Sequence, residues 1–263
     1  MFGLAKMSPK EVRALIRKGD LVQPTSGMCS GHIQANLAIV PKDLAFDFLL
    51  FAQRNPKPCP VLDVTDVGDP EPKLMAKGAD LRYDIPKYRI YEYGELVDEV
   101  INLEKYWRDD LVSFLLGCSF SFESAMINAS IPVRHIDDNH NVPMYITNID
   151  TVPAGSFYGK MVVSMRPVPH HQVVRAVQAT SRFPQVHGAP IHIGDPSIIG
   201  IKDINAPDFG DPSEIREGEV PLFWACGVTP QSIAMSSKPP LMITHSPGHM
   251  FICDPKDEDL AVL

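Results

Sequence analysis

Residues 111–124 read LVSFLLGCSFSFES and predict a buried strand that leads into a helix. The apolar run LVSFLL is typical of a strand buried on both faces, and serine residues follow it where a helix cap belongs. Residues 222–232, LFWACGVTPQS, repeat this order of strand, cysteine turn and helix start. The two stretches align without gaps and indicate an internal pseudo-repeat. The aligned pairs include Cys118 with Cys226, Ser121 with Thr229, and Glu123 with Gln231.

Apolar periodicity on both sides of these stretches predicts alternating helices and strands. Before residue 111 we expect a helix over 8–18, a strand over 32–40, a helix over 41–55, a strand over 60–64 and a β-hairpin over 81–100. From residue 121 we expect a helix to 129, strands over 142–147 and 160–168, a helix over 170–183 and a strand over 189–194. Loops follow until a strand over 222–227, a helix over 229–237 and a strand over 241–245.

This order of elements predicts an α/β fold in two parts. Strand, helix and strand near the N-terminus favour a layered α/β domain, built from residues 1–120 together with 195–263. Residues 121–194 read as a smaller, inserted α+β domain of two layers. The turn sequence GDP at 194–196 is the expected boundary.

Composition and charge exclude several classes of function. The net charge of −8 comes without a Lys/Arg block, which argues against nucleic acid as the main partner. No apolar run approaches the roughly 20 residues of a membrane span, and the N-terminal residues do not resemble a secretory signal, so we expect a cytoplasmic protein without a membrane partner. The five cysteines never form a C-x-x-C pair and give no zinc framework. We expect no metal and no cofactor, and a homodimer is the commonest default.

The helix starts in both halves of the pseudo-repeat are candidate carboxylate sites. Free backbone N–H groups and the helix dipole attract anions at such places, although ordinary helix caps have the same sequence pattern. The candidate substrate-binding residues here are Ser119, Ser121, Gly227 and Thr229.

Arg134 in IPVRHID and Arg166 in VVSMRPV are further candidates for binding a substrate carboxylate. Both lie in or beside apolar segments that read as extended. A guanidinium in such surroundings pairs with a carboxylate, either that of a ligand or that of the protein. Both alternatives stay open at this point. His135 alternates to the opposite face of the expected strand and has a weaker case.

Histidines cluster in two stretches, HGAPIHIGD and THSPGH. Histidine titrates near neutrality and can act as base or acid, and loops at strand ends gather catalytic groups. We therefore expect His245, His192 or His187 to transfer protons, with Asp195 or Glu123 orienting the imidazole.

Cys118 offers a different chemistry. A cysteine between a strand and a helix can have a lowered pKa and act as a nucleophile. Cysteine is also among the residues most often buried as a small apolar side chain. A hydrolase that uses Cys118 is thus one alternative. A non-catalytic protein that binds acidic metabolites at the anion sites is another.

Long strings along the chain resemble those of the D-glutamate cyclase-like family, which is catalogued as hydro-lyases of unknown substrate. The strings that carry this resemblance include GHIQANLAIVP, FLLGCSFSFE, IPVRHI, VVSMRPV, RFPQVHGAPIHIGDP, FWACGVTPQ and ITHSPGHMF. The resemblance implies an α/β and α+β fold and the conversion of D-glutamate to 5-oxo-D-proline with loss of water. His32 and Tyr83 depart from the family pattern, where we expected Tyr and Thr.

A lyase that acts on a small carboxylate is the leading hypothesis. Cyclising glutamate requires a base to free the amine, a site that stabilises the reacting carboxylate, and an acid that releases water. Eliminating water from a hydroxy acid requires the same three parts, so the sequence does not separate the two reactions. Alanine at His245 or at His192 is expected to abolish turnover.

Overall fold

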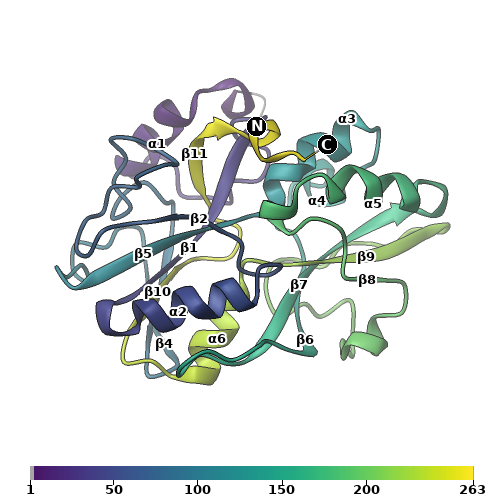
Figure 1. Cartoon of the computed structure of the whole chain (residues 1–263). Helices are drawn as coiled ribbons and strands as arrows, with labels where there is room; N and C mark the ends of the chain where they lie inside the picture. The colour runs from purple at the N-terminus through teal and green to yellow at the C-terminus, as the bar shows by residue number, and fades with distance from the viewer. Residues whose placement is uncertain (1–2, 263) are drawn as a thin grey trace.

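The computed structural model describes residues 3–262, which build two antiparallel sheets with helices packed against them (Figure 1). The first sheet has the order β2-β5-β1-β10-β3-β4, with β11 also paired to β1. Its strands are β1 (His32–Pro41), β2 (Val61–Val64), β3 (Tyr88–Glu92), β4 (Glu95–Val100), β5 (Leu111–Gly117), β10 (Met242–His245) and β11 (Phe251–Lys256). The second sheet has the order β6-β7-β9-β8. Its strands are β6 (Met144–Asp150), β7 (Lys160–Pro169), β8 (His192–Ile193) and β9 (Glu219–Ala225).

Helices cover both sheets. The α-helices are α1 (Pro9–Arg17), α2 (Lys42–Arg54), α3 (Glu123–Asn128), α4 (Arg134–Asp137), α5 (Val173–Ser181) and α6 (Thr229–Ser237). Short 3-10 turns are η1 (Leu4–Lys6), η2 (Ser119–Phe122), η3 (His170–Gln172), η4 (Pro184–Val186), η5 (Pro196–Ile199) and η6 (Asp257–Leu260). Helices α2 and α6 pack on the first sheet, and α3 and α5 pack on the second (Figure 1). None of the helices described over residues 3–262 has the length and apolar character needed to cross a membrane.

The predicted α/β class is confirmed, because helices and open sheets share the structure. The hairpin expected over 81–100 is β3 paired with β4. Two local expectations differ. The segment around Arg134 is a short helix instead of an extended strand, closed by a bond from the Asp138 N–H to the Arg134 carbonyl oxygen (2.8 Å). Strand β11 was not among the expected elements, and its sequence FICDPK contains a proline, which is uncommon inside a strand.

Strand β9 belongs to the second sheet. The expected division placed it in the first domain, with residues 195–263, but β9 pairs with β7 from Val163↔Ala225 to Pro169↔Glu219. The apolar run predicts a strand without specifying its partner, since pairing between distant strands depends on tertiary contacts. The division into two domains stays a prediction.

The two halves of the pseudo-repeat are the two crossings between the sheets. Strand β5 of the first sheet continues into η2 and α3, which pack on the second sheet. Strand β9 of the second sheet continues into α6, whose Ile233 and Ala234 pack on the first. The aligned hydroxyls make matching bonds to the sheet that the chain has just left. Ser121 Oγ accepts from the Gln34 N–H on β1, and Thr229 Oγ1 accepts from the Val162 N–H on β7 (both 3.0 Å).

The crossings meet at Asn36 on β1. Asn36 Nδ2 donates to the carbonyl oxygen of Gly117 (2.7 Å), at the end of β5. A Cβ atom at Gly227 would lie 1.9 Å from the same Nδ2 atom, so the second crossing requires glycine there. This close approach brings the chain after β5 and the chain after β9 together, and candidate catalytic groups collect beside them.

Candidate active site

A buried ion pair lies beside the first crossing. Arg166 on β7 is fully buried, and its Nη2 atom donates to Glu123 Oε1 (2.5 Å) and to Ser119 Oγ (3.0 Å). The guanidinium lies over the rings of Phe122 and Trp224, at 5.4 and 5.5 Å from their centroids. These contacts take both charges out of water while pairing them with each other, which is the arrangement that buried charges require.

His135 on α4 joins this pair. Its Nε2 atom lies 2.9 Å from Glu123 Oε1, but off the line of an N–H bond, so the contact is electrostatic. Burial lowers the pKa of His135 more than the Glu123 carboxylate raises it, which leaves the imidazole neutral at neutral pH. Burial raises the pKa of Glu123, but His135 and Arg166 outweigh burial and hold that pKa at about 2. A neutral imidazole therefore contacts an ionised carboxylate.

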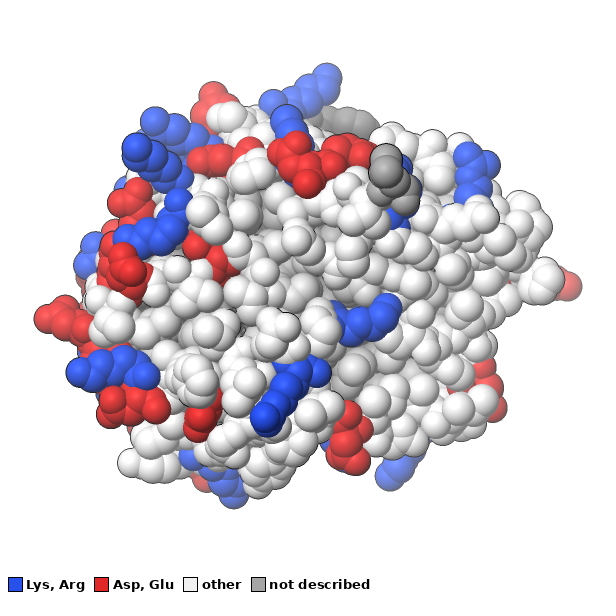
Figure 2. Space-filling view, viewed as in Figure 1, with Lys and Arg blue, Asp and Glu red and all other residues white. Residues whose placement is uncertain are grey.

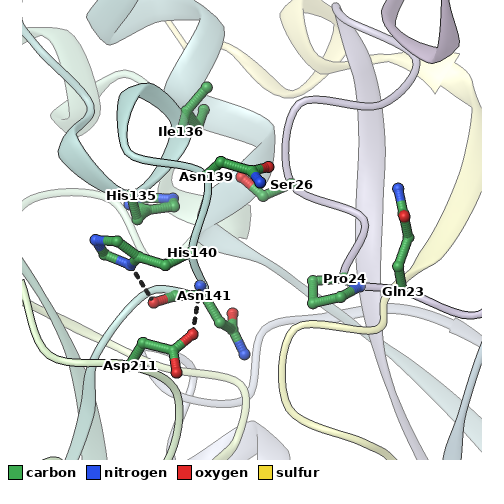
Figure 3. A pocket seen from close by; sticks show the side chains of 9 residues that line it. All are labelled: Gln23, Pro24, Ser26, His135, Ile136, Asn139, His140, Asn141 and Asp211. Carbon is green, nitrogen blue, oxygen red and sulfur yellow. Dashed lines mark hydrogen bonds between the residues drawn. The ribbon is translucent and has the colours of Figure 1, made fainter. Parts of the chain in front are cut away.

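The ion pair adjoins a pocket of about 240 Å³. Figure 3 shows Gln23 and Pro24 on one side of the open space, with His140, Asn141 and Asp211 on the other. His135 and Ser26 also line the pocket, together with Ile136 and Asn139. Ser26 Oγ donates to Glu123 Oε2 (3.3 Å), which connects the pocket to the carboxylate behind it. The pocket thus brings two histidines and several neutral polar groups within reach of one small molecule.

The loop after β10 supports the pocket wall. Asn141 Nδ2 donates to the carbonyl oxygen of Pro247 (3.1 Å), and the Asn141 N–H donates to Asp211 Oδ2 (2.9 Å). Gly248 has a φ of +82°, and a Cβ atom there would lie 2.5 Å from Asn141 Oδ1. The stretch THSPGH therefore contributes to this pocket through its proline carbonyl and its glycine.

Three of the residues expected from the sequence come together in the ion pair, namely Glu123, Arg166 and Ser119. The other helix-start residues have structural contacts. Ser121 and Thr229 bond backbone groups of neighbouring strands, and Gly227 packs on Asn36. Arg134 is buried and pairs with Glu219. Both arginines thus contact a carboxylate of the protein, which was one of the two open alternatives.

His245 lies inside the first sheet, away from this pocket. Its Nδ1 atom accepts from the Leu37 N–H (3.1 Å). Burial lowers its pKa to about 3, so the imidazole is neutral. Its Nε2 atom has no hydrogen-bond partner among residues 3–262.

His187 is buried in a strained conformation, with φ +81°. Its Nδ1–H donates to the carbonyl oxygen of Lys57 (2.7 Å), and its buried Nε2 finds no partner in the part of the chain that the structure describes. Burial is the main cause that lowers the pKa of His187 to about 4, with smaller contributions from the charges of Lys57 and Arg166. Strain of this kind at a non-glycine residue is frequent at functional sites.

His192 and Asp195 lie together at β8 and do not line the pocket. His192 Nε2 lies 2.6 Å from the carbonyl oxygen of Asp195, and its ring packs beside Phe223. The Asp195 side chain accepts from the Ser197 N–H (2.9 Å) at the start of η5. His192 and Asp195 thus contact neighbouring residues and not the residues of the ion pair.

The thiol of Cys118 is buried, and burial raises its pKa far above the ordinary value of 9.0. It is therefore protonated at neutral pH, which disfavours a nucleophilic role. The described residues, 3–262, contain no group of three or more His, Cys, Asp or Glu side chains that could hold a metal ion.

The sequence reasoning missed His135, His140, Ser26 and Asn141 as pocket residues. His135 received a weaker case because strand alternation directs it away from Arg134. In the short helix α4, consecutive side chains diverge by about 100° instead of 180°, so both can be buried. The string IPVRHI carried the usable signal, a histidine beside an arginine in an apolar segment.

Known proteins resemble this chain over most or all of its length. Residues 112–254 match the model of the D-glutamate cyclase family. The chain is 80% identical over 263 residues, all of both chains, to a protein of Psychrobacter arcticus, and 69% identical over 255 residues to one of Thermoanaerobacter (97% of this chain, 96% of the relative). It is 65% identical over 257 residues to YcsI of Bacillus subtilis (98% of this chain, 100% of the relative). Each of these relatives has the name "Putative hydro-lyase".

Proposed function

Because the chain belongs to the D-glutamate cyclase family, a lyase-type function is supported, and we propose that its reaction is the cyclisation of D-glutamate to 5-oxo-D-proline with loss of water. The observation that carries the proposal is the neutral imidazole of His135, which contacts ionised Glu123 at the edge of a small polar pocket. This arrangement supplies a base together with a group that stabilises its protonated form.

Proton transfer to His135 starts the reaction. Its Nε2 side contacts Glu123, so Nδ1 is the nitrogen left to accept a proton from the α-ammonium group of the substrate. The imidazolium that forms is stabilised by the Glu123 carboxylate. Arg166 keeps that carboxylate ionised, because protonating it would leave the buried guanidinium unpaired.

Ring closure and loss of water follow. The freed amine attacks the γ-carboxyl carbon, a C–N bond forms, and the carbon becomes tetrahedral. One C–O bond then breaks, and the oxygen leaves as water after it gains a proton from the acid and one from the attacking nitrogen. His140 in its imidazolium form is our candidate acid, since Nδ1–H donates to the Asn141 carbonyl (2.9 Å) and Nε2–H remains to donate to the ligand. The proton that His135 accepted then restores His140 for the next turnover. Side-chain groups of Ser26, Gln23 and Asn139 are available to hydrogen-bond the substrate.

The histidines chosen from the sequence remain predictions. Of these, His187 is buried and bonds to the carbonyl oxygen of Lys57. His192 lies beside Asp195 and provides a test of the sequence-based assignment, since it is only partly buried and its replacement is not expected to unfold the protein.

The experiment incubates purified protein with D-glutamate, L-glutamate and both enantiomers of a 2-hydroxy acid, with products followed by NMR. Wild type is expected to form 5-oxoproline from D-glutamate. His135→Gln should lower turnover by about 100-fold or more, the usual contribution of a general base. His171→Gln is the matched control, because His171 is exposed and should retain full activity.

Three outcomes would contradict the proposal at different points. An alkene product from a hydroxy acid, without 5-oxoproline, would assign the water-elimination reaction. Ligand-induced stabilisation without any product would favour a binding protein. Full activity of His135→Gln, with loss of activity in His192→Gln, would return the catalytic role to the histidines expected from the sequence.

A further inference from the structure

The second half of the pseudo-repeat has its own arginine. Gln231 on α6 occupies the position aligned with Glu123, and its Oε1 atom accepts from Nη1 of Arg89 on β3 (3.1 Å). Glu123 accepts in the same way from Arg166 on β7. In each crossing, the side chain two residues after the aligned hydroxyl therefore contacts an arginine from a strand.

The two arginines differ in how their charge is balanced. Gln231 is neutral, so it does not cancel the charge of Arg89. Arg89 Nε donates to Glu99 Oε2 (2.9 Å), but Lys87 forms an ion pair with the same carboxylate. Two cations thus share Glu99, and one positive charge remains in the group of Lys87, Arg89 and Glu99.

Arg89 also remains accessible. Its side chain is 22% exposed, whereas that of Arg166 is 0% exposed. Nη2 of Arg89 makes no hydrogen bond to any protein atom within residues 3–262. The guanidinium lies 5.9 Å from the ring centroid of Phe209 and is held by the bonds of Nε and Nη1. A guanidinium held in this way, with Nη2 left to donate, is suited to bind a carboxylate.

Two short connections join Arg89 to the pocket described above. Phe209 contacts Arg89, and Asp211 lines the pocket; two residues of chain span at most about 7 Å. On the other side, Ser246 Oγ donates to Glu99 Oε2 (3.0 Å), and the next residue, Pro247, accepts from the pocket residue Asn141. These two connections place the charged group near the pocket, outside the residues that line it.

We propose that Arg89 binds the non-reacting carboxylate of a dicarboxylate substrate, next to the amino group that gives its proton to His135. This inference rests on the proposed function for its second part. Its first part, recognition of a dicarboxylate through Arg89, is independent of turnover. The Nη2 atom would donate to the carboxylate, and the remaining positive charge would favour a dianionic ligand over a monoanionic one.

Binding of glutarate and butyrate, measured by calorimetry, tests the inference. Wild type is expected to bind glutarate at least about tenfold more tightly than butyrate, and Arg89→Gln should abolish this difference. Arg108→Gln is the matched control. It removes a positive charge from an exposed arginine that pairs with Asp110, outside the group of Lys87, Arg89 and Glu99, so the preference for glutarate should persist.

A second variant keeps the test decisive if Arg89→Gln does not fold. Gln231→Glu gives the second crossing the acid that the first one has, so it should neutralise Arg89 and weaken glutarate binding by about tenfold. Glutarate binding that survives Arg89→Gln, or Gln231→Glu, would overturn the inference, as would a wild-type protein without preference for glutarate. Glutarate binding through Arg89 in a wild-type protein that forms no 5-oxoproline would refute only the proposed reaction.

Discussion

Replacing Glu123 with glutamine should destabilise the protein by about 3–5 kcal/mol, because it leaves the guanidinium of Arg166 buried without a counter-charge. The lowered pKa of Glu123, about 2 against an ordinary value of 4.5, has the same sign. Part of that shift comes from the charge that His135 carries only in acid, so at neutral pH the loss is set by Arg166. A loss of about 3–5 kcal/mol is a large share of a typical total stability of about 5–15 kcal/mol.

The sign of the pH dependence follows from the lowered pKa. Glu123 binds its proton more readily in the unfolded chain, so its contribution is present in full above pH 4.5 and disappears as the pH falls towards 2. In Glu123→Gln this part of the acid sensitivity should be absent.

Urea denaturation at pH 7, with a double-mutant cycle, measures the effect. Arg166→Met should also cost about 3–5 kcal/mol, since it leaves the carboxylate unpaired. The double variant Glu123→Gln with Arg166→Met should lose at least about 2 kcal/mol less than the sum of the single losses, because neither charge then remains buried alone. Single losses below about 1 kcal/mol, or additive losses, would refute the reasoning.

Two further predictions concern the crossings. Cys118→Ser should retain most of the wild-type turnover in the NMR assay, because the thiol is protonated and buried; loss of turnover in a folded variant would revive the Cys118 hydrolase. Gly227→Ala should destabilise the protein by about 1–3 kcal/mol in urea, because the new Cβ would lie 1.9 Å from Asn36 Nδ2, and unchanged stability would mean that this contact relaxes freely.

Members of the buried ion pair followed from residue type and spacing, whereas none of the residues that line the pocket did. A cysteine turn followed by serines predicted a helix from residue 121, where the structure has the turn η2 followed by α3. The arginine in VVSMRPV predicted a carboxylate partner for Arg166. The partner itself, Glu123, was expected to orient a histidine, and it contacts one. That histidine is His135, which was set aside because strand alternation was applied to a segment that forms one helical turn.

Local sequence patterns did not predict the role of a residue where that role depends on contacts with residues far away in the chain. A histidine at a strand end, such as His245, is typical of a catalytic residue. Strand β10 pairs with β1 and β3 on its two sides, however, and the imidazole is buried. The sequence pattern of the hairpin, which is rich in tyrosine, did not indicate a functional role for Arg89. Only the contact with Gln231, 142 residues further along the chain, makes it the counterpart of Arg166.

The sequence by itself determined the family, the α/β class, most elements and the two similar crossings, because these depend on long matching strings and on short-range periodicity. The tertiary structure decided that β9 joins the second sheet, that each crossing packs its helix on the opposite sheet, and that Glu123 cancels one arginine while Gln231 leaves another charged. Pairing of distant strands and burial of charge depend on contacts between residues far apart in the chain. No local pattern encodes those contacts.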